Sequence, residues 1–449
     1  MAIANALEND IRSGRLAAGI RLPTHRQLAY VLGTAPGTIS RAYEEAARRG
    51  LVAGEVGRGT FVRGNSASVE VQDELVVEEP AQRNVIDLGL NLSAVGQSEE
   101  LLQNTLSNLG RQRDLSPLLE YKPAGGMRSH RESGALWIER WGVEASASQI
   151  VVCNGAQHGL LISLLSLARQ GDTILTENLT YPGMRALGHQ LGIECHGLPM
   201  DEEGLRPDAL ESACQATKAK VLYCMPDLHN PTTATMSVAR RREIAAIARR
   251  WGLWIIEDDV YGFLTETTRV RIASLAPDLT IYINSASKCM APGLRVGFLR
   301  VPDTLIDTVV TVARMTDWMV APLMAEIVHR WIREGQADQL VHWHREQAMR
   351  RQAIAQRHLE PFCVATSSRS YHLWLHLPKR WRMDVFIPEL LRRGVKILPA
   401  ETFCVRREIC PHAVRVCLGS VTDEAALENA LRVLADVLSG QSPPIMTMV

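Results

Sequence analysis

The sequence lacks the features by which secreted, membrane-bound and zinc-containing proteins are recognised. Its nine cysteines are scattered through 449 residues without a Cys-x-x-Cys pair, so we predict neither a disulfide framework nor a metal site. No apolar run approaches the roughly 20 residues that cross a bilayer. The amino terminus also contains acids where a signal peptide would be basic and then apolar. These absences predict a cytoplasmic protein.

The chain also lacks net charge, because 49 basic residues balance 49 acidic ones. This balance is uneven along the sequence: residues 1–63 contain nine arginines, no lysine and five acidic residues. A basic module on a neutral protein suits a partner with a phosphate backbone, although a solvated charged face would have the same composition. A chain of this length is expected to form two or three domains.

The first 64 residues have the pattern of a winged helix-turn-helix. Pro23-Thr24 begins a helix that Gly33 ends, and a second helix follows whose first turn offers hydroxyls and an arginine. Two short strands around a glycine-rich tip are expected in residues 51–62. The pattern resembles GntR-type domains, although Ala35 and Pro36 replace the serine and arginine usual there. The resemblance implies DNA contacts from Arg26, Thr38, Ser40, Arg41 and Arg58.

Residues 65–84 have the composition of a linker, and residues 85–449 have that of an α/β domain. Four strands are expected to alternate with helices, which implies a parallel sheet that helices cover. Ligands of such sheets bind at the carboxyl ends of the strands. After about residue 301 the pattern changes to helices and short strands. The predicted strands span residues 149–153, 173–176, 221–224 and 253–257.

Two motifs at such strand ends are the most informative part of the chain. The fourth strand delivers Asp258-Asp259-Val260-Tyr261, and Ser285-Ala286-Ser287-Lys288 follows thirty residues later. A lysine that forms a Schiff base and an acid that keeps a pyridine nitrogen protonated are what a protein supplies to pyridoxal 5'-phosphate. A lone lysine after a strand is usually a solvated loop charge. The pair in this order resembles the fold-type I aminotransferases, from about Tyr121 to the carboxyl terminus.

This resemblance implies a full set of ligands for the cofactor. Lys288 would form the Schiff base, and Asp258 would hold the pyridinium charge, with Asp259 as the rival acid. Tyr121 would reach the phosphate of the neighbouring subunit, which implies a homodimer, and Arg415 would bind the α-carboxylate of a ligand. The other implied cofactor ligands are Gly155, Ala156, Gln157, Tyr181, Asn230, Tyr261, Ser285 and Arg295.

The order of the two modules is that of the MocR family of bacterial transcription regulators. The family's fold is a winged helix-turn-helix joined to a fold-type I aminotransferase-like domain. In this chain the resemblance implies a large part with a mixed or parallel sheet at about residues 121–300, and a small α+β part at about residues 301–449. The resemblance implies a DNA-binding regulator that senses pyridoxal phosphate, a small amine or an amino acid through an aldimine at Lys288. An active aminotransferase, converting an amino acid to a 2-oxo acid, with an appended winged helix is the alternative. A regulator whose only effector is pyridoxal phosphate is a third possibility, and the sequence leaves all three open.

Overall fold

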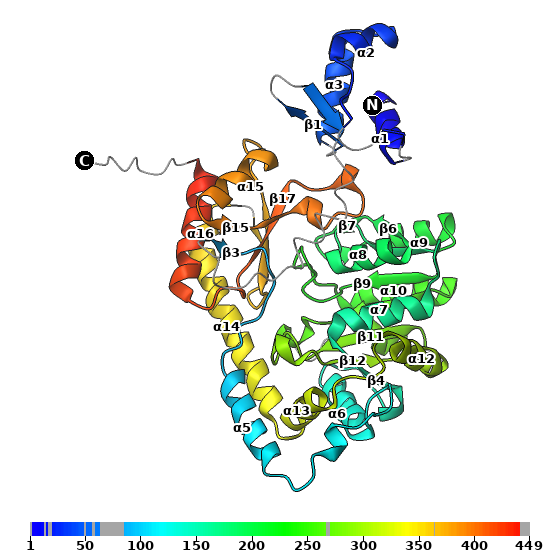
Figure 1. The fold of residues 1–449 in the computed structure, drawn as a ribbon, viewed down its shortest axis with the longest axis vertical. Coiled ribbons are helices and arrows are strands. Elements are labelled where there is room, and N and C mark those ends of the chain that lie inside the picture. The colour runs from blue at the N-terminus through cyan, green and yellow to red at the C-terminus, as the bar shows by residue number, and fades with distance from the viewer. Residues whose placement is uncertain are drawn as a thin grey trace, which may run out of the picture. The chain divides into compact units, whose positions relative to one another are not determined.

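The computed structural model describes residues 2–12, 15–16, 20–48, 51–55, 59–62, 85–265, 270–362 and 364–440. The chain divides into two compact units (Figure 1), and the first comprises residues 1–76 together with Arg407–Ile409. The predicted linker, residues 65–84, lies outside the described residues. Among the described residues, no helix combines the length and the apolar character needed to span a membrane.

The amino-terminal unit consists of three helices and a two-stranded antiparallel sheet. Thr24 caps the second helix, and its side chain and that of Gln27 bond each other's backbone N–H groups. The third helix supplies the core with Ile39, Tyr43 and Ala46, which pack on the other helices and the strands. The elements are α1 (Ala2–Arg12), α2 (His25–Val31), α3 (Pro36–Arg48), β1 (Val52–Glu55) and β2 (Gly59–Val62).

The second unit is built on a seven-stranded sheet in the order β4-β12-β11-β10-β9-β5-β6. All neighbours are parallel except β12, which is antiparallel to both β11 and β4. The sheet, predicted to be mixed or parallel, is therefore a mixed one. Residues 286–296 between β11 and β12 are too few for a crossover helix, and the chain therefore turns back. The strands are β4 (Ile150–Cys153), β5 (Thr173–Glu177), β6 (Glu194–Leu198), β9 (Val221–Cys224), β10 (Trp254–Asp258), β11 (Thr280–Ser285) and β12 (Gly297–Arg300).

Helices cover both faces of this sheet (Figure 1). Ile255 and Ile256 are consecutive on β10, and each is fully buried in a different apolar cluster, one on either face. Strands buried on both faces explain the near-continuous apolar runs in the sequence. The helices of this part are α5 (Ser98–Gly110), α6 (Arg128–Glu139), α7 (Gly155–Leu167), α8 (Pro182–Leu191), α9 (Pro207–Ala216), α10 (Val238–Trp251), α11 (Ile272–Leu275), α12 (Ile306–Asp317) and α13 (Pro322–Arg333).

A smaller four-stranded antiparallel sheet, in the order β13-β14-β17-β16, occupies the carboxy-terminal part. Its helices bury a second apolar cluster that includes Phe386, Leu427 and Leu431. A segment from the beginning of the second unit also belongs to this part, since β3 (Ile86–Asp87) pairs with β15 (Val395–Lys396). The other elements are β13 (Val364–Ala365), β14 (His372–His376), β16 (Leu398–Pro399), β17 (Ala413–Cys417), α14 (Gln336–Leu359), α15 (Met383–Arg392) and α16 (Glu424–Ser439), with a hairpin of β7 (Met200–Asp201) and β8 (Gly204–Leu205) beside the large sheet.

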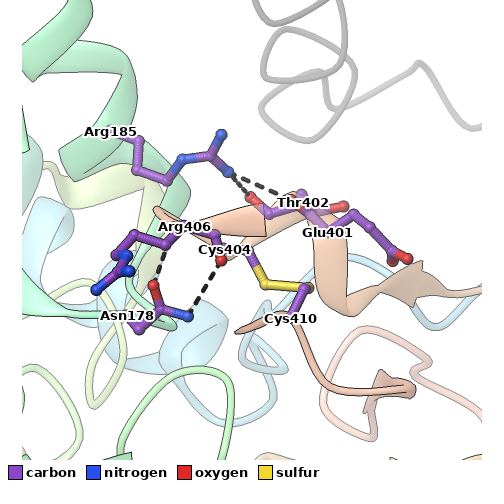
Figure 2. Close-up of a disulfide and its surroundings, with 7 residues drawn as sticks. All are labelled: Asn178, Arg185, Glu401, Thr402, Cys404, Arg406 and Cys410. Atoms are coloured by element: carbon purple, nitrogen blue, oxygen red, sulfur yellow. Dashed lines mark hydrogen bonds between the residues drawn. A yellow bond between two sulfur atoms is a disulfide. The ribbon is translucent and has the colours of Figure 1, made fainter. Parts of the chain in front are cut away.

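One pair of cysteines, Cys404 and Cys410, forms a disulfide (Figure 2). The sequence predicted no disulfide framework, and it did not identify this single pair. The two residues are six apart in sequence, a spacing that matches no familiar motif, so only the folded loop brings them together. Asn178, directly after β5, accepts a hydrogen bond from the Arg406 N–H at 2.9 Å. The closed loop is thereby fastened to the end of the large sheet.

Candidate functional site

Five strands of the large sheet end in polar or aromatic side chains, and these ends lie at one edge of the sheet. Lys288, after β11, has its Nζ atom 5.9 Å from the ring centroid of Tyr261, which follows β10. Asn230, after β9, accepts a hydrogen bond of 2.7 Å from Arg415 Nη1 of the smaller sheet. Residues that are distant in sequence therefore meet where the two sheets approach each other.

Lys288 is partly buried and donates a hydrogen bond from Nζ to the carbonyl of Asn91. Burial, helped by the positive charges of Arg415 and Arg295, lowers the pKa of Lys288 to about 8, against the opposing effects of Cys417 and Asp258. A lower pKa leaves a larger fraction of the amine neutral at physiological pH. The neutral amine is the form that attacks a carbonyl carbon.

Asp258, the last residue of β10, has one satisfied carboxylate oxygen and one free one. The Tyr223 hydroxyl donates to Oδ2 at 2.9 Å, whereas Oδ1 is buried and has no hydrogen-bond partner among the described residues. Burial raises the pKa of Asp258 to about 6. A buried oxygen without a donor is costly, and a protonated ring nitrogen would satisfy it, so this side chain fits the implied cofactor.

Asp259 faces a different environment, in a buried ion network of four side chains. Arg271 Nε lies 2.8 Å from Asp259 Oδ2 and 3.6 Å from Asp227 Oδ2, and Arg241 contacts Asp227 at 2.9 Å. The Tyr282 hydroxyl also donates to Asp259. Although burial opposes its charge, Arg271 has its pKa raised well above the usual value by Asp259 and Asp227. Asp259 therefore has a structural role, as the partner of Arg271 and Tyr282 next to the site.

The start of α7 and the turn before β12 approach each other closely enough to require a glycine. Gly155 has φ +78°, and a Cβ atom there would lie 2.9 Å from Arg295 Nη2. Arg295 itself adopts left-handed backbone, with φ +49°. Its guanidinium donates to the Asn154 carbonyl at 3.3 Å and to Ser287 Oγ at 3.4 Å, so a cation is held at a helix amino terminus.

The same place offers further donors that suit an anion. The first-turn N–H groups of α7 have no partner within the helix, and they include those of Ala156 and Gln157. Ser285 ends β11, and its Oγ accepts the N–H of Ser287 at 3.1 Å. Its hydroxyl donates to the Val296 carbonyl at 3.4 Å, a long bond that a phosphate oxygen could replace. Backbone N–H groups, a hydroxyl and a guanidinium are a donor set that fits a phosphate.

The other predicted residues of the site are Tyr181, Tyr261, Asn230 and Arg415. Tyr181 precedes α8, and Gly183 makes room for its ring, because a Cβ there would lie 2.3 Å from Tyr181 Cε1. Tyr261 and Asn230 are buried. Arg415, on β17, also donates to the Gly89 carbonyl, and its guanidinium lies 4.6 Å from the ring centroid of Phe403.

Tyr121 lies apart from these groups on the surface of the chain. It is 80% exposed and packs edge-on against Trp318, with ring centroids 5.8 Å apart. The prediction that Tyr121 reaches a neighbouring subunit stays a prediction.

Sequence reasoning missed several residues that contact the predicted ones. Tyr223 donates a hydrogen bond to Asp258. Asn91 contacts Tyr261 and Lys288, and His372 contacts Asn91. A tyrosine in the otherwise apolar strand Val221–Cys224 was the one available signal for Tyr223. Asn91 has no local signal, because its partners are 170 or more residues away.

The predicted DNA contacts lie on α2 and α3 of the amino-terminal unit. Arg26, Thr38 and Arg41 are exposed. The hydroxyl of Ser40 is engaged within the unit, since it donates to the Pro36 carbonyl at 3.2 Å and lies 3.0 Å from His25 Nδ1. Arg58 lies outside the described residues.

Comparison with known families assigns a description to each part of the chain. Residues 83–434 match the family described as aminotransferase class I and II. Residues 1–62 match the bacterial regulatory proteins of the gntR family.

Relatives and solved structures agree with these matches. The HTH-type transcriptional regulator YdeF of Bacillus subtilis is 32% identical, over 97% of this chain and 94% of the relative. The HTH-type transcriptional regulator YjiR of Escherichia coli is 26% identical, over 96% and 93%. The crystal structure of kynurenine aminotransferase from Pyrococcus horikoshii superposes with a TM-score of 0.75 at 21% identity, over 84% of this chain and 95% of that one. LysN, an α-aminoadipate aminotransferase from Thermus thermophilus, gives 0.73 at 22% identity, over 84% and 95%.

Proposed function

The chain belongs to the aminotransferase class I and II family and, because it also carries a gntR-family module, to the MocR-type transcription regulators. From this premise we propose that it is a DNA-binding transcription regulator that holds pyridoxal 5'-phosphate. The amino-terminal unit binds DNA, and the second unit binds the cofactor and senses a small amine or amino acid. The protein acts as a homodimer, to which Tyr121 contributes across the subunit boundary. It works in the cytoplasm.

One observation supports the cofactor most directly. A buried carboxylate oxygen of Asp258 has no hydrogen-bond partner among the described residues, and it belongs to the same group of side chains as Lys288, whose pKa is about 8. A pyridine nitrogen that carries a proton would satisfy the oxygen, and a carbonyl carbon would suit the amine.

Each residue has a separate role in this proposal. When bound, pyridoxal phosphate supplies an electrophilic carbon that accepts a primary amine, and a ring that withdraws electrons. Lys288 holds the cofactor covalently, and Asp258 keeps the proton on its ring nitrogen. Tyr261 and Asn230 donate hydrogen bonds to the ring oxygen, and Tyr181 stacks on the ring. The phosphate is bound by the first turn of α7, from Gly155 to Gln157, together with Ser285 and Arg295.

Arg415 is the group that recognises the effector. Its guanidinium now bonds the Asn230 side chain and the Gly89 carbonyl. A carboxylate is a better partner than a neutral carbonyl, because both members of the pair are charged. An effector carboxylate would therefore draw Arg415 away from Gly89. A ligand that binds one arrangement of these groups more tightly increases the population of that arrangement. The change in population would then change the affinity of the protein for DNA.

The test uses the full-length protein with added pyridoxal phosphate. Borohydride reduction followed by peptide mapping should place the cofactor on the peptide that contains Lys288. Lys220→Ala, at an exposed lysine, should leave this labelling intact, whereas Lys288→Ala should abolish it. An unmodified Lys288 peptide in the reduced wild-type protein would refute the cofactor assignment.

A second measurement separates the regulator from an enzyme with an appended winged helix. The protein is mixed with amino acids and 2-oxo acids, and both turnover and binding to its own promoter are followed. An amino acid that changes promoter affinity without sustained turnover supports the regulator. Sustained turnover with no effect on promoter affinity would favour the aminotransferase.

A further inference from the structure

The segment that follows β3 crosses the candidate site and brings Asn91 between three of its side chains. Asn91 is 8% exposed. Its backbone carbonyl accepts the hydrogen bond from Lys288 Nζ. Its side-chain Nδ2 lies 2.8 Å from the hydroxyl of Tyr261 and 3.1 Å from Nδ1 of His372. One residue thus contacts both the lysine and the phenol of the site.

A backbone carbonyl determines the directions of these hydrogen bonds. The His229 oxygen can only accept, so His372 Nε2, at 3.1 Å from it, carries a hydrogen. Burial, with the nearby charge of Arg415, lowers the pKa of His372 to about 3, so the ring is neutral and its Nδ1 is an acceptor. Asn91 must therefore present its NH₂ group, and not its oxygen, to His372.

The second hydrogen of the Asn91 NH₂ group then goes to Tyr261. Because the Tyr261 oxygen accepts this bond, its own hydrogen remains to donate elsewhere. Burial raises the pKa of Tyr261 far above its ordinary value, so the phenol keeps that hydrogen. Asn91 Oδ1 is buried without a hydrogen-bond partner among the described residues, so this orientation leaves an acceptor unsatisfied in order to donate twice.

We propose that Asn91 is a positioning residue, which makes Tyr261 a hydrogen-bond donor to the ring oxygen of the bound cofactor and holds Lys288 beside it. The inference rests on the proposed function, because it requires the cofactor. The side chain of Asn91 acts through Tyr261, whereas its backbone carbonyl accepts the hydrogen bond from Lys288 Nζ.

The experiment is a pH titration of the visible absorbance of the cofactor-loaded, full-length protein. A hydrogen bond donated to the ring oxygen favours its deprotonated form, so weakening that donor raises the midpoint. Asn91→Leu removes both side-chain donors at similar volume, and the midpoint should rise by roughly 0.5 to 1 pH unit. Asn429→Leu, the same change at an exposed position of α16, should leave it unchanged.

The groups that face Tyr261 are unaltered in these variants. They include the charges of Arg415 and Asp258, the Lys288 amine, the side chains of Cys417 and Tyr181, and the rings of His372 and Tyr371.

A double-mutant comparison tests whether the effect passes through the phenol. Tyr261→Phe should raise the midpoint more than Asn91→Leu does, and adding Asn91→Leu to it should change nothing further. An unchanged midpoint in Asn91→Leu, or the same shift in the Tyr261→Phe background, would overturn the inference.

Two outcomes of other kinds are also decisive. If Asn91→Leu does not fold, Asn91→Asp replaces it: the carboxylate takes the Tyr261 hydrogen, so the midpoint should again rise, and an unchanged value again overturns the inference. A wild-type protein without any cofactor absorbance refutes the proposed function itself, and the inference with it. A wild-type protein with absorbance that Asn91 does not influence leaves the function intact.

Discussion

Asp258 and Asp259 are consecutive carboxylates, and their replacement by asparagine should change the stability of the cofactor-free protein in opposite directions. Asp259→Asn leaves Arg271 as a buried charge with a weakened partner, a loss of about 3 to 5 kcal/mol in the free energy of unfolding. Asp258 has no cationic partner of this kind. Its asparagine variant keeps an acceptor for the Tyr223 hydroxyl and removes a buried charge.

The magnitude for Asp258 follows from its pKa. Burial raises that pKa from 3.8 to about 6, and each unit corresponds to about 1.4 kcal/mol. The folded state therefore binds the proton more tightly than the unfolded state. Ionising Asp258 costs the fold up to about 3 kcal/mol, a cost that develops between about pH 4 and pH 6 and is full at pH 7. Asp258→Asn should recover part of this at pH 7 and none below about pH 4.

Urea unfolding followed by tryptophan fluorescence measures these changes. All nine tryptophans lie between residues 137 and 381, so the signal reports the carboxy-terminal unit alone. Cofactor affinity, measured by absorbance, should fall about tenfold or more in Asp258→Asn, because the charge that holds the ring proton is lost. Equal losses of stability in the two variants, or a loss of affinity in Asp259→Asn as large as in Asp258→Asn, would refute the assignment.

Three further predictions address the effector, the DNA and the disulfide. Arg415→Lys should weaken the response to an amino acid more than cofactor binding, because one ammonium cannot replace a bidentate guanidinium; a parallel loss of both, seen by absorbance and promoter binding, would contradict this. The full-length protein should bind DNA with a steep salt dependence, and Arg41→Ala should cost about 1 to 3 kcal/mol on the specific site if it reaches a base edge. Equal losses on specific and random DNA would make Arg41 a phosphate contact. Cys404→Ser should lower the free energy of unfolding by roughly 2 kcal/mol under oxidising conditions only, because it opens the loop to Cys410; the same loss under reducing conditions would exclude the disulfide as its cause.

The sequence predicted four of the seven strands of the large sheet, β4, β5, β9 and β10, because each is a largely apolar run that leads to a polar group. The predicted strand at residues 221–224 coincides with β9, and the one at 253–257 is displaced by one residue from β10. Burial on both faces makes such runs visible without knowledge of their neighbours. The direction of a strand leaves no such pattern in the sequence. β12 runs antiparallel to β11 because the connection between them is too short for a crossover helix.

Most of the candidate site could be predicted where its residues end or follow strands, as Asp258 and Lys288 do, whereas Arg415, within β17, was found from the family resemblance alone. Asn91 and His372 come from the segment after β3 and from the smaller sheet, and only the packing of the small sheet against the large one brings them to Tyr261. The cysteine pair was missed for the same reason, because the loop from Cys404 to Cys410 has no pattern until it folds.

The buried ion network of Asp227, Arg241, Asp259 and Arg271 also restricts how this sequence can diverge. Its charges cancel in pairs, and each side chain is at most 1% exposed, so any single replacement leaves an odd charge in the interior. Replacing a whole buried ion pair by apolar residues of similar volume is often tolerated, whereas removing one partner is not. Residues of this network should therefore be substituted together in homologues, and a homologue that has lost Arg271 should also have lost one of the acids. Substitutions at Asp259, just after β10, and at Arg271, just before α11, should occur together in homologues, whatever ligand the protein binds.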